Sequence, residues 1–290
     1  MTVIRAKVLG FCAGVRRAVD LAVCEAGRAG TERARRVYTL GPLIHNPKVS
    51  ADLYSLGVET ADALPDDGEN ASIIIRTHGV SPDVENRLKN SAFRIIDATC
   101  PNVKASQLKT REFSRAGYCL FLAGEAGHAE IAGIRGYAEG GFCFVVCGAD
   151  EAREKAAALF ETNKGAKTAL IAQTTISEEE YYSISAAIKE YFPLLETVNT
   201  ICAAAKDRQN ALRGLLDHVD AVIIAGGRQS SNTRRLLAAA QESGKPCALC
   251  ESAADIPRGY FSDFETIGLC AGASTPDAVI DEIEQALQRK

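Results

Sequence analysis

Residues 7–19 read KVLGFCAGVRRAV, and this order of apolar run, cysteine and helix-like stretch decides the fold. It recurs at 94–106 as RIIDATCPNVKAS and at 197–209 as TVNTICAAAKDRQ. Their cysteines, 88 and then 102 positions apart, are Cys12, Cys100 and Cys202. Metal knuckles place their cysteines only a few residues apart, so spacings this long separate whole structural units. The repeat therefore predicts three similar units, each with a cysteine at a strand-to-helix turn.

Strand-like apolar runs alternate with helix-like stretches along the chain, which is typical of an α/β protein with parallel sheets. The runs are continuously apolar, as expected for strands that helices cover on both faces. They are RVYTLG (36–41), ASIIIRT (71–77), CLFLAG (119–124), FCFVV (142–146), TALIAQ (168–173), AVIIAGG (221–227) and TIGLCAG (266–272). We predict three α/β modules with small, mostly parallel sheets, at residues 1–98, 99–196 and 197–290, each of ordinary domain size.

Local signals mark several helix starts. Ser177 followed by Glu180 has the spacing of a capping box, and Ser274 with Asp277 predicts a similar start near the C-terminus. Arg208 interrupts the apolar stripe of the helix expected after the third cysteine.

Composition excludes several classes of protein. A net charge of −4 argues against nucleic-acid binding, which needs a strongly basic surface. No apolar run approaches the roughly 18 residues of a membrane span. The first residues lack the basic and apolar regions of a secretory signal, so we expect a cytoplasmic protein whose ten cysteines are free thiols or metal ligands.

The three repeated cysteines suit metal binding. A thiol at a helix N-terminus feels the positive end of the helix dipole, which favours the thiolate. Three thiolates could hold an iron–sulfur cluster and leave one metal position open for chemistry. A lone cysteine of this kind is more often a small core residue, but three in matching contexts favour ligands. Core positions are expected for the remaining cysteines: Cys24, Cys119, Cys143, Cys147 and Cys270 within apolar runs, and Cys247 and Cys250 in a buried strand.

Three of the four histidines, His45, His78 and His128, follow apolar runs at turns rich in small or polar residues. The ends of parallel strands meet at one face of an open α/β sheet, so these rings are expected at a common site. They could ligate a metal. Beside hydroxyl-rich turns they fit an anion site better. His218 lies late in a helical pattern and is expected on the surface.

Hydroxyl-rich turns also lie between apolar runs and helix starts, where phosphate groups bind readily. They contain Thr174, Ser230, Ser231, Asn232 and Ser274. Ordinary helix capping is the competing interpretation of each hydroxyl. The sequence contains no G-x-x-x-x-G-K-[ST] phosphate loop, and no G-x-G-x-x-G follows a strand.

Glu130 follows His128 in GHAEIAGI. A carboxyl beside a cluster and a phosphate is a candidate proton donor, although an acidic residue in the first turn of a helix is also favoured by the dipole alone.

Taken together, these motifs resemble the 4-hydroxy-3-methylbut-2-enyl diphosphate reductase family of the methylerythritol phosphate route to isoprenoids. The matching segments, in order between residues 10 and 277, are GFCAGVRRAV, GPLIHNP, THGVSP, DATCPNV, GHAEIAG, AQTTIS, TIC…RQ, GGRQSSNTRRL and GASTPD. Two positions depart from the family pattern. Ala205 stands where a threonine is common, which puts one polar contact near the cluster in doubt, and GHAE replaces GHPE.

The resemblance implies three α/β modules around a pseudo-threefold axis, with one [4Fe-4S] cluster at the centre. It implies that the cluster has three ligands, Cys12, Cys100 and Cys202, and one open iron. It implies a diphosphate-binding set of His45, His78, His128, Ser230, Ser231, Asn232 and Ser274. Glu130 and Thr174 would contact the substrate hydroxyl, with Glu130 delivering the proton.

The family removes that hydroxyl with two electrons and two protons, giving isopentenyl and dimethylallyl diphosphates, and its electrons usually come from ferredoxin or flavodoxin. Two alternatives of other classes remain open from the residues alone. One is a zinc hydrolase of a phosphorylated small molecule, which the absence of an H-E-x-x-H helix disfavours. The other is a non-catalytic redox sensor built on the same cluster.

Overall fold

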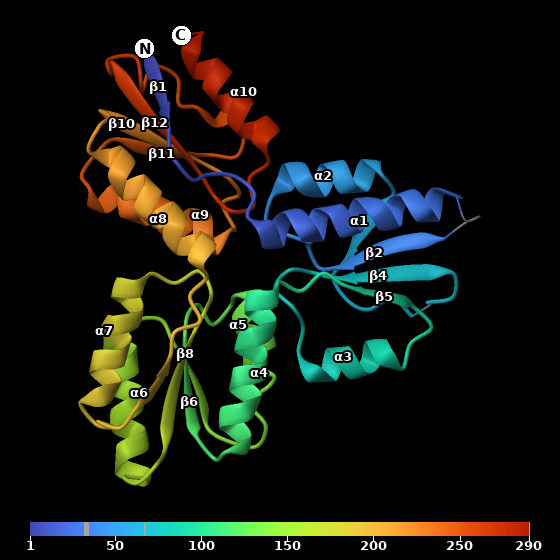
Figure 1. The fold of residues 1–290 in the computed structure, drawn as a ribbon, viewed down its shortest axis with the longest axis vertical. Helices are drawn as coiled ribbons and strands as arrows, with labels where there is room; N and C mark the ends of the chain where they lie inside the picture. Colours follow the sequence, from blue (N-terminus) through green and yellow to red (C-terminus); the bar gives the residue numbers. More distant parts are fainter. Residues whose placement is uncertain (32–34, 67, 290) are drawn as a thin grey trace. The chain divides into compact units, whose positions relative to one another are not determined.

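The computed structural model of the protein describes residues 1–31, 35–66 and 68–289 (Figure 1). The chain forms two compact units. Unit 1 combines Met1–Ala61 with Ala203–Lys290, and unit 2 is the continuous segment Asp62–Cys202. Each unit is described below by itself.

Unit 1 contains helices and strands from both ends of the chain. Its N-terminal elements are β1 (Thr2–Arg5), α1 (Ala13–Thr31), β2 (Arg36–Leu40), α2 (Pro47–Ser55) and β3 (Val58–Ala61). Its C-terminal elements are α8 (Ala203–Leu216), β10 (Ala221–Ala225), α9 (Ser231–Glu242), β11 (Cys247–Cys250), the 3₁₀ turn η1 (Ala253–Asp255), β12 (Thr266–Ala271) and α10 (Asp277–Gln288).

The strand β10 shows how unit 1 builds its core. All five of its residues are buried, because side chains pack against helices on both faces of the sheet. Ile223 packs with Ile283 of α10 on one face, whereas Val222 and Ile224 pack with residues of α8 and α9 on the other. The helices α8 and α9 accordingly lie on the opposite side of this sheet from α10 (Figure 1).

Unit 2 alternates strands and helices without interruption. Its elements are β4 (Ala71–Ile75), α3 (Pro82–Lys89), β5 (Arg94–Asp97), α4 (Pro101–Arg115), β6 (Cys119–Ala123), α5 (Ala129–Arg135), β7 (Cys143–Val146), α6 (Ala149–Thr162), β8 (Thr168–Ala172), α7 (Glu178–Lys189) and β9 (Glu196–Val198).

In the core of unit 2, strand residues likewise pack against helices on both faces of the sheet. Phe121 of β6 packs with the buried residues of α6 and α7, while the next residue, Leu122, packs with Ile131 and Ile134 of α5. In Figure 1, α6 and α7 lie on one side of β6 and β8, and α4 and α5 lie on the other. Each fully buried Leu, Ile or Phe contributes about 1.5–3 kcal/mol through the hydrophobic effect, so the alternation along β6 anchors both helix layers.

The predicted α/β class with small parallel sheets is confirmed. The strands form three four-stranded sheets, with the orders β1-β12-β10-β11, β3-β2-β4-β5 and β7-β6-β8-β9. Every strand pair whose register is known is parallel. The division into modules at residues 1–98, 99–196 and 197–290 stays a prediction. The pairing of β1 with β12 joins the first residues of the chain to its last strand.

Some local predictions were right and others wrong. Ser177 caps α7 as predicted, since its side chain accepts a hydrogen bond from the backbone N–H of Glu180. Ser274 does not cap α10, because Pro276 occupies the capping position. Cys119, Cys250 and Cys270 are buried as predicted, whereas Cys143 and Cys247 are only partly buried and Cys24 and Cys147 are exposed. No helix among the described residues is both long and apolar enough to span a membrane.

Candidate active site

Each of the three repeated cysteines directly precedes a helix, as the repeat predicts. Cys12 lies immediately before α1, Cys202 immediately before α8, and Cys100 is the N-cap residue of α4. All three are half-buried free thiols. Cys12 belongs to unit 1, whereas Cys100 and Cys202 belong to unit 2. The convergence of the three sulfur atoms stays a prediction.

Unit 1 holds Cys12 in place through the backbone. The amide of Cys12 donates to the carbonyl of Ala273 at 3.1 Å, and the amide of Val15 approaches the Cys12 sulfur at 3.4 Å. The buried side chain of Arg208, the polar interruption noted in the sequence, donates twice to the carbonyl of Gly10 at 2.6 and 3.2 Å. This guanidinium therefore ties α8 to the turn that carries Cys12.

Unit 2 attaches its two cysteines to the ends of strands. The amide of Cys100 donates to the carbonyl of Thr77, which follows β4, at 3.0 Å. The amide of Cys202 donates to the carbonyl of Thr174, which follows β8, at 2.8 Å. Neighbouring parallel strands end at the same edge of a sheet. Each bond therefore continues the hydrogen bonding between two strands, β4 with β5 and β8 with β9, and holds the cysteine at the carboxyl end of its sheet.

Glu130 and Thr174 form a doubly hydrogen-bonded pair in unit 2. One carboxylate oxygen of Glu130 accepts from the Thr174 backbone N–H at 2.6 Å, and the other accepts from the Thr174 hydroxyl at 2.9 Å. Both residues are buried, with 2% and 6% of their surfaces exposed. A buried carboxyl joined to a hydroxyl can pass a proton, because the hydroxyl both accepts and donates.

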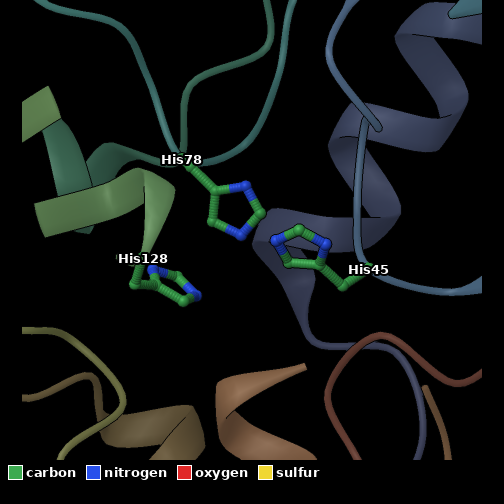
Figure 2. Close-up of side chains that lie close together, drawn as sticks. All are labelled: His45, His78 and His128. Atoms are coloured by element: carbon green, nitrogen blue, oxygen red, sulfur yellow. The ribbon is translucent and has the colours of Figure 1, made fainter. Parts of the chain in front are cut away.

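The rings of His78 and His128 meet edge to face, with their centroids 5.1 Å apart (Figure 2). His128 is the N-cap residue of α5, and its Nδ1 accepts a hydrogen bond from the backbone N–H of Glu130 at 3.2 Å. A nitrogen that accepts carries no proton, so the neutral ring has its proton on Nε2 and presents a donor there. The fold thus selects the donating tautomer of His128.

In unit 1 the predicted hydroxyl residues gather around the segment between β2 and α2, which carries His45. The Ser274 hydroxyl lies 3.4 Å from that of Ser230 and 3.5 Å from the backbone carbonyl oxygen of His45. Gly227 makes this packing possible, because a Cβ on it would lie 2.2 Å from the His45 carbonyl oxygen. A cavity of about 290 Å³ opens beside His45 and Gly227 and is also lined by Arg228 and Glu251.

Asn232, in the first turn of α9, is buried with 4% of its surface exposed. Neither its side-chain oxygen nor its side-chain nitrogen has a hydrogen-bond partner among the described residues. Leaving a buried amide unsatisfied costs about 1–3 kcal/mol, so this amide is a candidate contact for a ligand or a water molecule. Ser230 caps the same helix, accepting from the amide of Thr233 at 3.4 Å, and Ser231 follows it in the buried first turn.

Burial raises the thiol pKa of four of the other cysteines. It raises the pKa of the Cys143 thiol to about 11 and that of Cys270 to about 12. It also raises the pKa values of Cys119 and Cys247. These four thiols stay protonated at neutral pH, which makes them poor metal ligands.

One polar residue near the cysteines was missed in the sequence. The side-chain amide of Asn102, two residues after Cys100, donates to the sulfur of Cys202 at 3.1 Å. An amide in the first turn after a cysteine was visible in DATCPNV, but its partner 100 positions away was not.

The residues fit an iron–sulfur group. The three thiols are unoxidised and partly accessible, and two of the sulfur atoms accept hydrogen bonds from N–H donors, Cys12 from Val15 and Cys202 from Asn102. Such donors stabilise the negative charge of thiolate ligands.

Comparisons with known proteins agree with this chemistry. The family model of the LytB protein matches residues 3–288. The 4-hydroxy-3-methylbut-2-enyl diphosphate reductase of Treponema denticola is 44% identical, over 99% of each chain. That of Aquifex aeolicus is 36% identical, over 99% of this chain and 96% of its own length.

Two solved structures are similar over all or nearly all of this chain. A structure of (E)-4-hydroxy-3-methyl-but-2-enyl diphosphate reductase, the terminal enzyme of the non-mevalonate pathway, has 35% identity and a TM-score of 0.70, with both chains fully covered. The E-1-hydroxy-2-methyl-but-2-enyl-4-diphosphate reductase from Plasmodium falciparum has 25% identity and a TM-score of 0.90, over 99% of this chain and 88% of that one. The chain described here belongs to the LytB protein family.

Proposed function

We propose that this protein is an oxidoreductase that removes the hydroxyl group of 4-hydroxy-3-methylbut-2-enyl diphosphate. The reaction consumes two electrons and two protons and yields water with isopentenyl or dimethylallyl diphosphate. The single observation that carries the proposal is the connection from Glu130 through Thr174 to Cys202. It links a buried acid to the amide and hydroxyl of Thr174, and the backbone carbonyl of Thr174 to the backbone amide of Cys202.

LytB enzymes are iron–sulfur proteins. Three thiols are proposed to hold one [4Fe-4S] cluster with one open iron: Cys12, Cys100 and Cys202. When bound, such a cluster supplies electrons and a Lewis-acidic metal position. The chain's contribution is to hold each thiol at the start of a helix, where the dipole and N–H donors favour the thiolate.

Proton delivery is proposed for Glu130 and Thr174. In its protonated form Glu130 would donate to the Thr174 hydroxyl, whose own proton then turns toward the leaving oxygen of the substrate. The backbone N–H of Thr174 keeps the Glu130 carboxyl in register with that hydroxyl. Protonation turns a poor leaving group into water, which general acid catalysis accelerates by about 10²–10⁴-fold.

The diphosphate is proposed to bind to histidine rings, hydroxyls and an amide. The set comprises His45, His78, His128, Ser230, Ser231, Asn232 and Ser274, with Thr174 contacting the substrate hydroxyl. The Nε2 donor of His128 and the unsatisfied amide of Asn232 support this assignment, because both suit phosphate oxygens. The start of α9 adds backbone N–H groups and a helix dipole.

The remaining assignments are proposed on the same basis. A ferredoxin or flavodoxin is the proposed electron donor, and the cytoplasm is the proposed location. A zinc hydrolase and a non-catalytic redox sensor, both open from the residues alone, are disfavoured because the relatives named above are all reductases.

The test is to purify the protein without air and incubate it with the hydroxylated allylic diphosphate and a chemical reductant. We expect a brown protein with about four iron and four sulfide per chain, and conversion of the substrate to both products. A colourless preparation, or one that contains zinc in place of iron, would contradict the proposal.

A further inference from the structure

We propose that Asn102 sets the reduction potential of the cluster by donating its side-chain amide to the sulfur of Cys202. The inference rests on the proposed function, in which Cys202 is a cluster ligand. Asn102 lies in the first turn of α4, and Cys202 lies immediately before α8. The contact therefore joins two residues that are 100 positions apart in the sequence.

The contact is short. The Asn102 nitrogen lies 3.1 Å from the Cys202 sulfur, closer than the 3.4 Å between the Val15 amide and the sulfur of Cys12. An amide N–H donates strongly to a thiolate, because the acceptor is charged. The donor is a side chain, so a substitution can remove it without altering the backbone.

Both ends of the contact are held independently within unit 2. On the donor side, Gln107 of α4 donates to the carbonyl of Val80 at 3.3 Å, and Lys104 of α4 pairs with Glu85 at 2.5 Å. These contacts hold α4, whose first turn carries Asn102.

On the acceptor side, the amide of Cys202 bonds to Thr174 at 2.8 Å. The Thr200 hydroxyl donates to the carbonyl of Ala172 at 2.6 Å and accepts from its amide at 3.0 Å, which fastens the segment to the end of β8. The amide and the sulfur therefore meet because the fold holds each of them there.

The electrostatic effect has a definite sign. Reduction adds negative charge, which spreads onto the ligand sulfur atoms. A hydrogen bond to one of them stabilises the reduced state more than the oxidised state and raises the reduction potential. Without the Asn102 amide, the cluster should be harder to reduce.

The experiment compares anaerobically purified wild-type protein with three variants, using a dithionite titration followed by electron paramagnetic resonance. Asn102→Leu removes the donor, and Asn102→Asp keeps the shape but places a carboxylate oxygen near the sulfur. Asn86→Leu is the matched control, because Asn86 is an exposed asparagine on α3 of the same unit.

At the wild-type midpoint, we expect the ratio of reduced to oxidised cluster in Asn102→Leu to fall about tenfold, a shift of about 59 mV for one electron. Asn102→Asp should shift further in the same direction, and Asn86→Leu should match wild type. Iron content measured alongside shows whether the cluster is retained. If Asn102→Leu does not retain the cluster, the reduction potential of Asn102→Asp tests the inference in its place.

An unchanged potential in a variant that retains its cluster overturns the inference, and so does an equal shift in Asn86→Leu. If wild-type protein carries no iron, both the inference and the proposed function fail. If the potential shifts as expected but wild-type protein does not consume the substrate, the role of Asn102 stands and the proposed reaction fails.

Discussion

Glu130 and Thr174 are joined twice, by a 2.6 Å bond from the Thr174 amide to one carboxylate oxygen and a 2.9 Å bond from its hydroxyl to the other. Two bonds to one residue fix both the position and the rotation of the carboxyl. Thr174 also accepts the amide of Cys202. The residue that orients the proposed acid is thereby bonded through its backbone to a proposed cluster ligand.

Glu130→Gln is expected to lower turnover at least about 100-fold, the scale of general acid catalysis, with little change in iron content or substrate binding. An amide cannot deliver the proton, but its oxygen can still accept from the Thr174 N–H and its NH₂ group can donate to the Thr174 hydroxyl, so the side chain keeps its position. Steady-state kinetics with parallel iron analysis checks this. Thr174→Ser, which keeps the hydroxyl, should retain most of the turnover. Wild-type turnover in Glu130→Gln would remove its acid role.

Three substitutions, Cys12→Ser, Cys100→Ser and Cys202→Ser, are each expected to abolish activity and to lower the iron content of anaerobically purified protein. A serine hydroxyl stays protonated at neutral pH and does not replace a thiolate ligand. Cys247→Ser is the control, because burial raises the pKa of Cys247 and disfavours its thiolate. Full iron content and turnover in any of the three variants would refute that ligand assignment.

Asn232→Leu should separate binding from stability. The wild-type amide is buried without a partner among the described residues, so its removal should leave the melting temperature of ligand-free protein unchanged or raised. Loss of one hydrogen bond to a charged phosphate should raise KM about tenfold or more. Thermal unfolding and steady-state kinetics give the two readouts, with the exposed Asn210→Leu as control. An unchanged KM would argue against a substrate contact.

Glu85 should make the stability of unit 2 depend on pH. Burial alone would raise the pKa of Glu85, but hydrogen bonds from Lys104 and Tyr137 outweigh it, and the net pKa is lowered from 4.5. A carboxyl whose pKa is lower in the folded state stabilises the fold above its unfolded pKa. That contribution is lost as pH falls through the folded pKa.

Glu85→Gln should therefore weaken the loss of stability that wild-type protein shows on acidification. Urea unfolding under anaerobic conditions between about pH 3 and pH 6 measures the difference. The control is Glu154→Gln, at an exposed position of α6. Equal pH slopes for Glu85→Gln and wild-type protein would show that the Glu85, Lys104 and Tyr137 contacts do not contribute.

The strands that were predicted from sequence and those that were missed differ in burial. The runs at β4, β6, β8 and β10 are buried at every position, so their apolar composition identified them. The short strand β3, with the sequence VETA, was missed, because it is largely exposed and polar and its pairing with β2 defines it. The strands β5 and β9 are also largely exposed, and only the repeated strand-to-helix turn before Cys100 and Cys202 indicated them. Such edge strands carry little hydrophobic signal.

The sequence by itself determined the α/β class, the family, and the residue types gathered at turns after buried strands. Those features are local, since each depends on a few neighbouring residues and their burial. Only the tertiary structure decided which groups meet: Glu130 with Thr174, Ser230 with Ser274, and Asn102 with Cys202. These partners are 44 to 100 positions apart, and the packing of helices on parallel sheets, rather than any local pattern, brings them within hydrogen-bonding distance.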